Sequence, residues 1–258
     1  GGAATFTPAH RGGAGPPMVC LHGFTDTWRT WELVLPALER EHDVLALTLP
    51  GHAGGPPLPG DVSAAAVLDV VEDALDAAGM TAAHLLGNSL GGYLALALAA
   101  RGRALSVVAL APAGGWEPDD PTVDAMLDRF EAMRAQVRAA IPHAPRMLAT
   151  PEGRAAATRL FVEDGAHLPA ELIEHQMLGV VRCTGLTEMV EGAHRAGFPL
   201  DPADVTCPVR IVWGTADRVL EWPAAAAGYR RALPTAHWAE LAGGGHCPQP
   251  DAPRATAE

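Results

Sequence analysis

The sequence predicts an α/β domain with a mostly parallel β-sheet flanked by helices and with a helical insertion in its second half. Three observations support this prediction. Short apolar runs alternate with stretches of helical periodicity, as in βαβ units. The 258 residues are 48% hydrophobic, which is enough for a large buried core. From residue 116 to residue 200 the alternation stops, and only helical patterns follow one another.

Elements alternate regularly through the first half of the core. Residues 18–24, MVCLHGF, are a short apolar run ending in a Gly-Phe pair, which predicts a buried strand. A helical pattern over residues 27–40 and a second strand over residues 43–49 follow. Ser63 as N-cap and Gly79 as C-cap bound the next predicted helix.

The alternation continues and is then interrupted. Residues 82–102 predict a strand, a tight turn and a helix, and residues 105–111 and 208–214 predict two further strands. Between these strands, residues 124–141 and 169–183 have helical patterns with no convincing strand among them.

These patterns divide the chain into a core and an insertion. Residues 1–115 and 201–258 are predicted to form the core, and residues 116–200 a helical cap inserted at one edge of the sheet. At the start of the core, the segment ATFTP is the one candidate for a further strand. At its end twelve residues follow His246, so a closing helix is expected to be short or missing.

Charge and composition argue against several classes of function. The formal net charge of −12 disfavours nucleic acid and anionic membrane surfaces as partners. All 18 basic residues are arginine, so no lysine exists for a Schiff base, for pyridoxal phosphate or for a phosphate-binding loop. The segment EREHD has metal-capable side chains but is a charged turn between a helix and a strand. No metal site and no cofactor is predicted.

Cysteine usage and the apolar runs predict a soluble, cytoplasmic protein. The four cysteines (Cys20, Cys183, Cys207 and Cys247) include no CxxC pair, which is typical of a reduced environment. The first residues have neither a basic start nor an apolar segment, so no signal peptide is expected. No apolar run approaches the roughly 20 residues of a membrane span.

A serine stands between two glycines where a predicted strand passes into a helix. Gly87-Asn88-Ser89-Leu90-Gly91 matches G-x-S-x-G, in which a sharp turn lifts the serine hydroxyl clear of the sheet. The neighbours of such a strained turn must have almost no side chain, which explains the glycines. The helix behind the serine directs free N–H groups toward the reacting centre. The pattern therefore predicts a nucleophile.

A serine nucleophile needs a base, and the base needs an acid that orients it. His246 follows the predicted last strand and three glycines, a setting that exposes a side chain at the edge of the sheet. Asp217 lies just past the carboxyl end of a strand, where catalytic groups collect in open α/β sheets. Glu117 and Asp119, which follow the preceding strand, are a minor alternative for the acid.

Five segments together resemble the α/β-hydrolase superfamily, in its branch of small cap-bearing esterases and carbon–carbon bond hydrolases. They are LHGF, LPGHAGG, GNSLGG, VWGTADRV and GGGHCP, and the resemblance runs from about Met18 to Pro248. It implies that Ser89 is the nucleophile, that His246 is the general base and that Asp217 is the partner of the base.

The resemblance also implies how the substrate is held. Backbone N–H groups of Phe24 and Leu90 would form an oxyanion hole, in which each donor contributes ~3 kcal/mol. His22 and Gly23 would shape that loop, and Asn88 would flank the nucleophile. We expect these three residues to belong to the substrate-binding site.

Apolar side chains in the predicted cap form a helical stripe. Met126, Phe130 and Met133 recur at i, i+4 and i+7, which is typical either of core packing or of a pocket wall. Because an inserted cap normally packs over the nucleophile, Met126 and Phe130 are predicted to bind substrate.

The favoured hypothesis is a serine hydrolase of carboxylic esters or thioesters with a neutral, mainly apolar acyl group, acting through an acyl-enzyme on Ser89. Three alternatives stay open: a carbon–carbon bond hydrolase of dienoic diketones, a cofactor-free perhydrolase and a non-catalytic ligand receptor. The serine, where an aspartate would be needed, argues against an epoxide hydrolase or a haloalkane dehalogenase. The expected partner is a small-molecule substrate, and the oligomeric state is left open.

Overall fold

The computed structural model describes residues 5–116 and 121–257, and a seven-stranded β-sheet forms its centre. The strands are β1 (Ala9–Gly12), β2 (Pro17–Leu21), β3 (Asp43–Leu47), β4 (Ala83–Asn88), β5 (Ala104–Leu110), β6 (Val209–Gly214) and β7 (His237–Leu241). Their order is β1-β3-β2-β4-β5-β6-β7, with β1 antiparallel to β3 and every other neighbouring pair parallel. The predicted fold class is confirmed.

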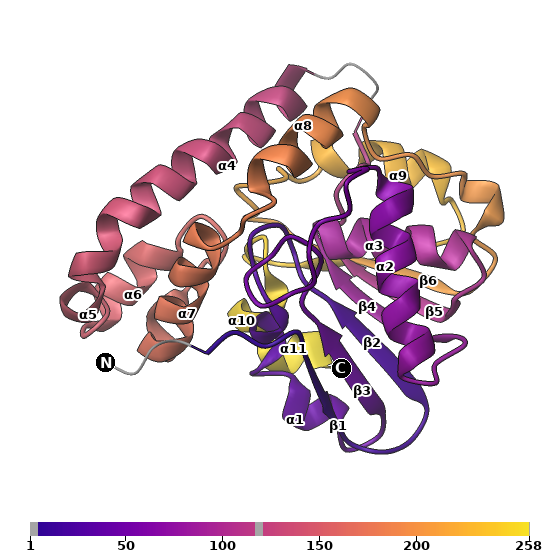
Figure 1. Cartoon of the computed structure of the whole chain (residues 1–258), viewed down its shortest axis with the longest axis horizontal. Helices are drawn as coiled ribbons and strands as arrows, with labels where there is room; N and C mark the ends of the chain where they lie inside the picture. Colours follow the sequence, from indigo (N-terminus) through magenta and orange to yellow (C-terminus); the bar gives the residue numbers. More distant parts are fainter. Residues whose placement is uncertain (1–4, 117–120, 258) are drawn as a thin grey trace.

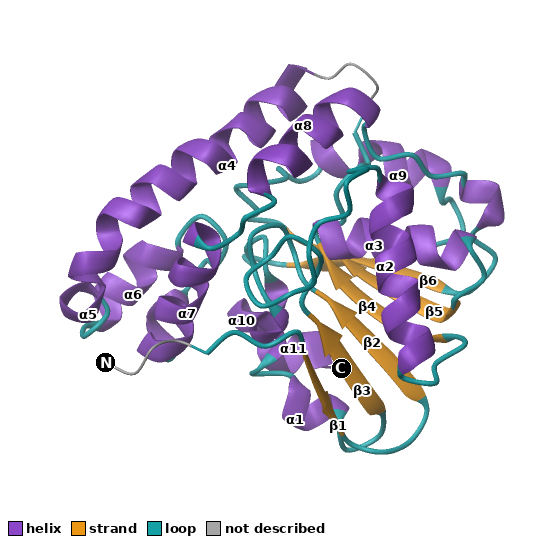
Figure 2. Cartoon of the chain, viewed as in Figure 1, coloured by secondary structure: helices purple, strands orange, loops and turns teal. Residues whose placement is uncertain are grey.

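Helices cover both faces of this sheet (Figure 2). The helices outside the connection between β5 and β6 are η1 (Trp28–Trp31), α1 (Leu35–Leu38), α2 (Ala64–Ala77), α3 (Leu90–Ala100), η5 (Ala224–Ala226), α9 (Ala227–Ala232), α10 (Pro248–Asp251) and α11 (Pro253–Ala257). The helices α10 and α11 follow His246 and span four and five residues.

Successive strand residues point to opposite faces, and each face buries its own apolar cluster. Leu85 of β4 belongs to a cluster that includes residues of α2 and α3, whereas Leu86 belongs to a second cluster with Trp31 of η1 and Leu35 of α1. This two-residue period is the one that a strand requires when both of its faces are covered.

The first strand lies later in the chain than the sequence predicts. β1 begins at Ala9, and residues 5–8 of the segment ATFTP belong to no strand. The ring of Phe6 lies 4.4 Å from the ring of His175, with the guanidinium of Arg182 over it at 5.1 Å. The aromatic residue that favours a strand in this segment therefore packs against the insertion.

The described residues of the insertion between β5 and β6 form helices joined by loops and contain no strand. The insertion contains α4 (Pro121–Ala140), η2 (Ile141–His143), α5 (Ala144–Met147), α6 (Pro151–Thr158), η3 (Gly165–His167), α7 (Ala170–Val181), α8 (Leu186–Ala196) and η4 (Pro202–Asp204). Two of these, α4 and α7, correspond to the predicted helical patterns. Figure 1 shows α4 to α8 gathered beside the sheet, with α4 running along the outside of the group.

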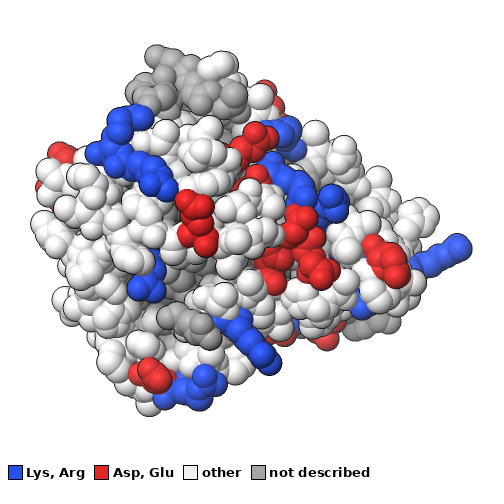
Figure 3. Space-filling model, turned by 180° about the vertical axis from the view of Figure 1, so that it is seen from behind, with Lys and Arg blue, Asp and Glu red and all other residues white. Residues whose placement is uncertain are grey.

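Charged side chains are mixed on the surface. On the face shown in Figure 3, acidic and arginine side chains lie side by side and form no continuous basic area. Arg101, for example, pairs with Asp69 at 2.7 Å, and Arg103 pairs with Glu72 at 3.6 Å. Over the described ranges, no helix combines the length and the apolar character needed to cross a membrane.

Candidate active site

Ser89 lies at the turn between β4 and α3 with a backbone conformation that side-chain-bearing residues rarely adopt. Its φ is 54° and its ψ is −115°. A Cβ on Gly87 would lie 2.2 Å from the carbonyl oxygen of Gly91, and a Cβ on Gly91 would lie 2.0 Å from that of Leu21. Both flanking positions therefore require glycine. The turn ends the strand abruptly and places Ser89 at the carboxyl end of β4.

His246 and Asp217 form a buried pair beside this turn. Nδ1 of His246 lies 2.7 Å from Oδ2 of Asp217, and the side chains are 3% and 0% exposed. Oδ1 of Asp217 accepts hydrogen bonds from the backbone N–H groups of Val219 and Leu220, each at 2.8 Å. Both carboxylate oxygens are thus engaged, so the carboxylate orients the imidazole and leaves its Nε2 available.

The sheet brings the three side chains to one edge. Ser89 follows β4, Asp217 follows β6 and His246 follows β7, and these strands are parallel. The carboxyl ends of parallel strands meet at the same edge, where ligand sites collect. Ser89 and His246 line one cavity of about 260 Å³ there.

Asn88 connects the loop of His246 to the serine turn. Its Nδ2 donates to the carbonyl oxygens of His246 at 3.0 Å and of Leu110 at 3.1 Å. Its Oδ1 accepts from Nε2 of Gln249, which also donates to Oγ1 of Thr30. Asn88 borders the cavity, but its amide is already saturated with protein partners. Its contacts position the His246 loop.

The two predicted oxyanion donors stand on either side of the serine. Leu90 is the first residue of α3, and Phe24 follows Gly23, where an added Cβ would lie 3.3 Å from Cβ of Ser89. In the described ranges, neither the Phe24 N–H nor the Leu90 N–H donates to a protein acceptor. Such uncommitted donors near a serine can stabilise an oxyanion.

Comparison with known proteins gives the family. Residues 18–258 match the family described as "Alpha/beta hydrolase family". The chain belongs to the α/β-hydrolase family. Epoxide hydrolase EphH of Mycobacterium tuberculosis is 32% identical over 208 residues, which cover 74% of this chain and 90% of that protein.

Solved structures show the same fold. A thermophilic esterase from Thermogutta terrifontis has a TM-score of 0.71 at 22% identity, covering 96% of this chain and 89% of that one. A meta-cleavage product hydrolase from Pseudomonas fluorescens has a TM-score of 0.70 at 20% identity, covering 96% of this chain and 90% of that one.

In this α/β hydrolase, His22 lies beneath the site and lines neither of the two cavities at Ser89. It is fully buried; its Nε2 accepts from the Leu49 N–H at 2.9 Å, and its Nδ1 lies 2.7 Å from the carbonyl oxygen of Gly23. Burial, reinforced by nearby His52, holds the pKa of His22 well below its ordinary value. The neutral ring fixes the loop that carries Phe24, and the structure does not bring it to the predicted substrate site.

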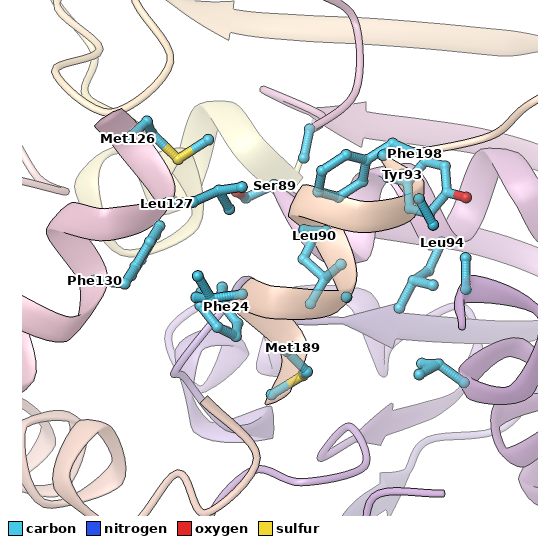
Figure 4. A pocket seen from close by; sticks show the side chains of 18 of the residues that line it. Phe24, Ser89, Leu90, Tyr93, Leu94, Met126, Leu127, Phe130, Met189 and Phe198 are labelled. Carbon is cyan, nitrogen blue, oxygen red and sulfur yellow. The ribbon is translucent and has the colours of Figure 1, made fainter. Parts of the chain in front are cut away.

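The α/β hydrolase has two cavities that meet at Ser89. The first, of about 100 Å³, is bounded by apolar side chains of α3, α4 and α8, including Leu90, Met126, Leu127 and Met189, and by Phe198, which follows α8 (Figure 4). The second, of about 260 Å³, contains His246 and lies under α4, α6 and α7. Phe24 and Phe130 border both cavities, and their ring centroids lie 4.8 Å apart at 74°. This aromatic pair is the partition between the cavities.

The insertion supplies the predicted residues Met126 and Phe130 to these walls, and Met133 lines the second cavity. The two alternative acids, Glu117 and Asp119, lie outside the described residues. Within the described ranges, no group of three or more histidine, cysteine, aspartate or glutamate side chains could hold a metal ion.

Asp26 is a carboxylate in the second cavity that the sequence analysis missed. Its Oδ1 accepts from the Thr27 N–H at 2.8 Å, and its Oδ2 accepts from Nε2 of Gln176 of α7 at 3.3 Å. Burial raises the pKa of Asp26 to about 6, although hydrogen bonds from Thr27, Thr30 and Gln176 oppose the rise. The one feature of the sequence that could have pointed to Asp26 is its position: it is a charged residue directly after LHGFT, two residues after the predicted oxyanion donor Phe24.

Proposed function

We propose that this chain is a serine hydrolase of carboxylic esters or thioesters that acts through an acyl-enzyme on Ser89. One observation carries the proposal. Ser89, with its strained backbone, shares a cavity with His246, and Nδ1 of His246 is held by the buried carboxylate of Asp217. Those are the three roles that acyl transfer requires.

The reaction would proceed in two halves. Nε2 of His246 takes the proton of Ser89 as Oγ attacks the carbonyl carbon, while Asp217 stabilises the imidazolium. The oxyanion receives hydrogen bonds from the N–H groups of Phe24 and Leu90. His246 then protonates the leaving alcohol or thiol. In the second half His246 activates a water, which attacks the acyl carbon and releases the acid and Ser89.

The charges near Ser89 favour ester hydrolysis over cleavage of a dienoic diketone acid. Such an acid carries a carboxylate, and a cationic side chain would be needed to bind it. Within the described residues, no arginine lines either of the two main cavities at Ser89, and the second contains the carboxylate of Asp26. The apolar first cavity supports a neutral, mainly apolar acyl group.

The wider setting supports a small-molecule substrate. The net charge of −12 opposes nucleic acid and anionic membranes as partners. The name of the M. tuberculosis relative suggests epoxides as a further class to assay. The serine at position 89 argues against them, since the aspartate needed for that chemistry is absent.

The proposal is tested by labelling and by a substrate panel. We expect a fluorophosphonate to label the wild type at Ser89 and not to label the folded Ser89→Ala variant. Hydrolysis of p-nitrophenyl butyrate is expected to fall by several orders of magnitude in Ser89→Ala. Near-native turnover by that variant, or an epoxide or dienoic diketone acid turned over far faster than every ester, would overturn the assignment.

A further inference from the structure

The position of the base shows which cavity would hold which half of an ester. A general acid must reach the oxygen of the leaving group that it protonates. His246 borders the second cavity and does not border the first. If the ester reacts as proposed, its alcohol therefore points into the second cavity, and its acyl group occupies the apolar first cavity.

The second cavity has the surface chemistry of a cation site. Asp26 is its carboxylate, and no arginine is among its described lining residues. Phe24, Phe130 and Phe161 also border it. A carboxylate together with aromatic rings suits a quaternary or other alkylammonium group, because both the charge and the ring quadrupoles attract a cation.

Asp26 has room for such a ligand. Each carboxylate oxygen can accept about two hydrogen bonds, and three donors engage the Asp26 carboxylate: the Thr27 N–H, the Thr30 hydroxyl and the Gln176 amide, so one acceptor position is left for a ligand. The side chain is partly exposed although it lies inside the fold. Gln176 on α7 and the backbone N–H of Thr27 are uncharged donors, so they hold the Asp26 carboxylate without neutralising its charge.

We propose that Asp26 determines the leaving-group specificity, and that the second cavity takes alcohols whose far end carries an alkylammonium cation. The inference rests on the proposed function for the orientation of the ester. It adds a substrate class, esters of apolar acids with cationic alcohols, and it assigns the selection to one carboxylate.

Butyrate esters of three closely related alcohols test the inference. The alcohols are choline, its neutral analogue 3,3-dimethylbutanol, and the anionic analogue in which one methyl of the tert-butyl group is replaced by carboxylate. At pH 8 we expect kcat/KM to fall in this order, with at least about a tenfold difference between the cationic and the anionic ester. In Asp26→Asn this ratio is expected to fall to the smaller preference that the aromatic rings alone maintain.

A matched variant controls for general charge effects. Glu171→Gln removes one carboxylate from α7, but Glu171 is 83% exposed, contacts Arg29 and lies outside the cavity. We expect it to keep the wild-type ratio. The inference is overturned if the wild type does not discriminate among the esters, if Asp26→Asn keeps the ratio, if Glu171→Gln also removes it, or if Asp26→Asn loses all three esters equally.

Binding to Ser89→Ala separates the two proposals, because it requires no turnover. We expect calorimetry to show butyrylcholine binding at least about tenfold more tightly than the neutral ester. If the wild type hydrolyses the esters but neither kcat/KM nor calorimetry shows a preference for the cationic ester, the inference about Asp26 fails and the proposed serine mechanism stands. A binding preference with no Ser89-dependent hydrolysis would remove the mechanism and leave the cation site.

Discussion

Ser89, the proposed nucleophile, has a backbone conformation that costs free energy to maintain. Its φ of 54° lies in the region that glycine tolerates and that a residue with a Cβ does not. Gly87 and Gly91 on either side have no room for a side chain, because an added Cβ would lie 2.2 Å and 2.0 Å from a backbone carbonyl oxygen. Surrounding packing therefore holds the strained backbone of the turn, and this keeps the Ser89 hydroxyl at the carboxyl end of β4.

Two variants measure this strain. Ser89→Ala and Ser89→Gly both remove the hydroxyl, but only the glycine relieves the backbone. We expect the free energy of unfolding of Ser89→Gly to exceed that of Ser89→Ala by about 1 kcal/mol, the strain relieved being partly offset by the entropy of glycine. Urea titration of both proteins gives the difference. A more stable alanine variant would show that the turn is not strained.

In the proposed mechanism, Asp217 contributes charge as well as orientation to His246. Asp217→Asn keeps the shape of the side chain but removes the charge that stabilises a protonated His246, and its amide can select the wrong tautomer. We expect kcat for p-nitrophenyl butyrate to fall by about three to four orders of magnitude. Glu117→Gln and Asp119→Asn serve as controls, and a larger loss in either of them would move the acid to that position.

Asp26 is expected to destabilise the protein at neutral pH. Its folded pKa of about 6 lies above the ordinary 3.8, so the folded state binds the proton more tightly than the unfolded state. Stability from this group is therefore present at low pH and is lost as the pH rises through about 4 to 6. Asp26→Asn removes the ionisation, so its advantage in free energy of unfolding should grow across that window and level off above it.

At pH 8 we expect the free energy of unfolding of Asp26→Asn to exceed that of the wild type by about 1 kcal/mol. The partial exposure of the side chain reduces the difference to this size. Urea titrations of the wild type and Asp26→Asn at pH 4, 5, 6 and 8 measure it. A difference that is constant with pH would show that desolvation of the carboxylate is not the cause.

At the scale of elements, α4 decides how the space above Ser89 is divided. Met126 and Leu127 line the first cavity, Met133 and Gln136 line the second, and Phe130 between them borders both. One helix thus supplies a wall to each cavity and, with Phe24, the partition between them.

Removing the Phe130 ring from the partition should change which acyl-chain length the enzyme prefers. In the wild type we expect kcat/KM for p-nitrophenyl esters to rise with acyl length, at ~0.8 kcal/mol per buried methylene, and then to fall when the first cavity is full. Phe130→Ala joins the cavities, so the maximum should move to longer acids. Met133→Ala is the control, because Met133 lines the second cavity and not the first. An unchanged maximum in Phe130→Ala would contradict this division.

The elements also show which features a sequence can predict. The turn at Ser89 depends on residues within five positions of one another, and its glycines are visible as a pattern. The position of β1 was missed because Phe6 packs against α7 and the segment that follows it, far along the chain. The helices α5 and α6 span only four and eight residues, so their periodicity is weak.

At the scale of the whole molecule, the features missed are those that depend on distant packing. Asp26 meets Gln176, 150 positions away, and Asn88 meets Gln249, 161 positions away. No local pattern marks these pairs, since an aspartate or glutamine near a loop is usually solvated. The predicted division into a core of residues 1–115 and 201–258 and a cap of residues 116–200 stays a prediction.

The partition formed by Phe24 and Phe130 has a kinetic consequence for the proposed enzyme. After the first half-reaction the acyl group stays covalently bound in the first cavity, or acyl compartment. The departing alcohol leaves the second cavity, or alcohol compartment, empty beside His246. Water and any new alcohol then compete for the vacated compartment. An alcohol that Asp26 attracts would capture the acyl group before water does, so the same architecture would support transesterification. The ratio of ester to free acid would then be set by the affinity of the vacated compartment for the incoming alcohol.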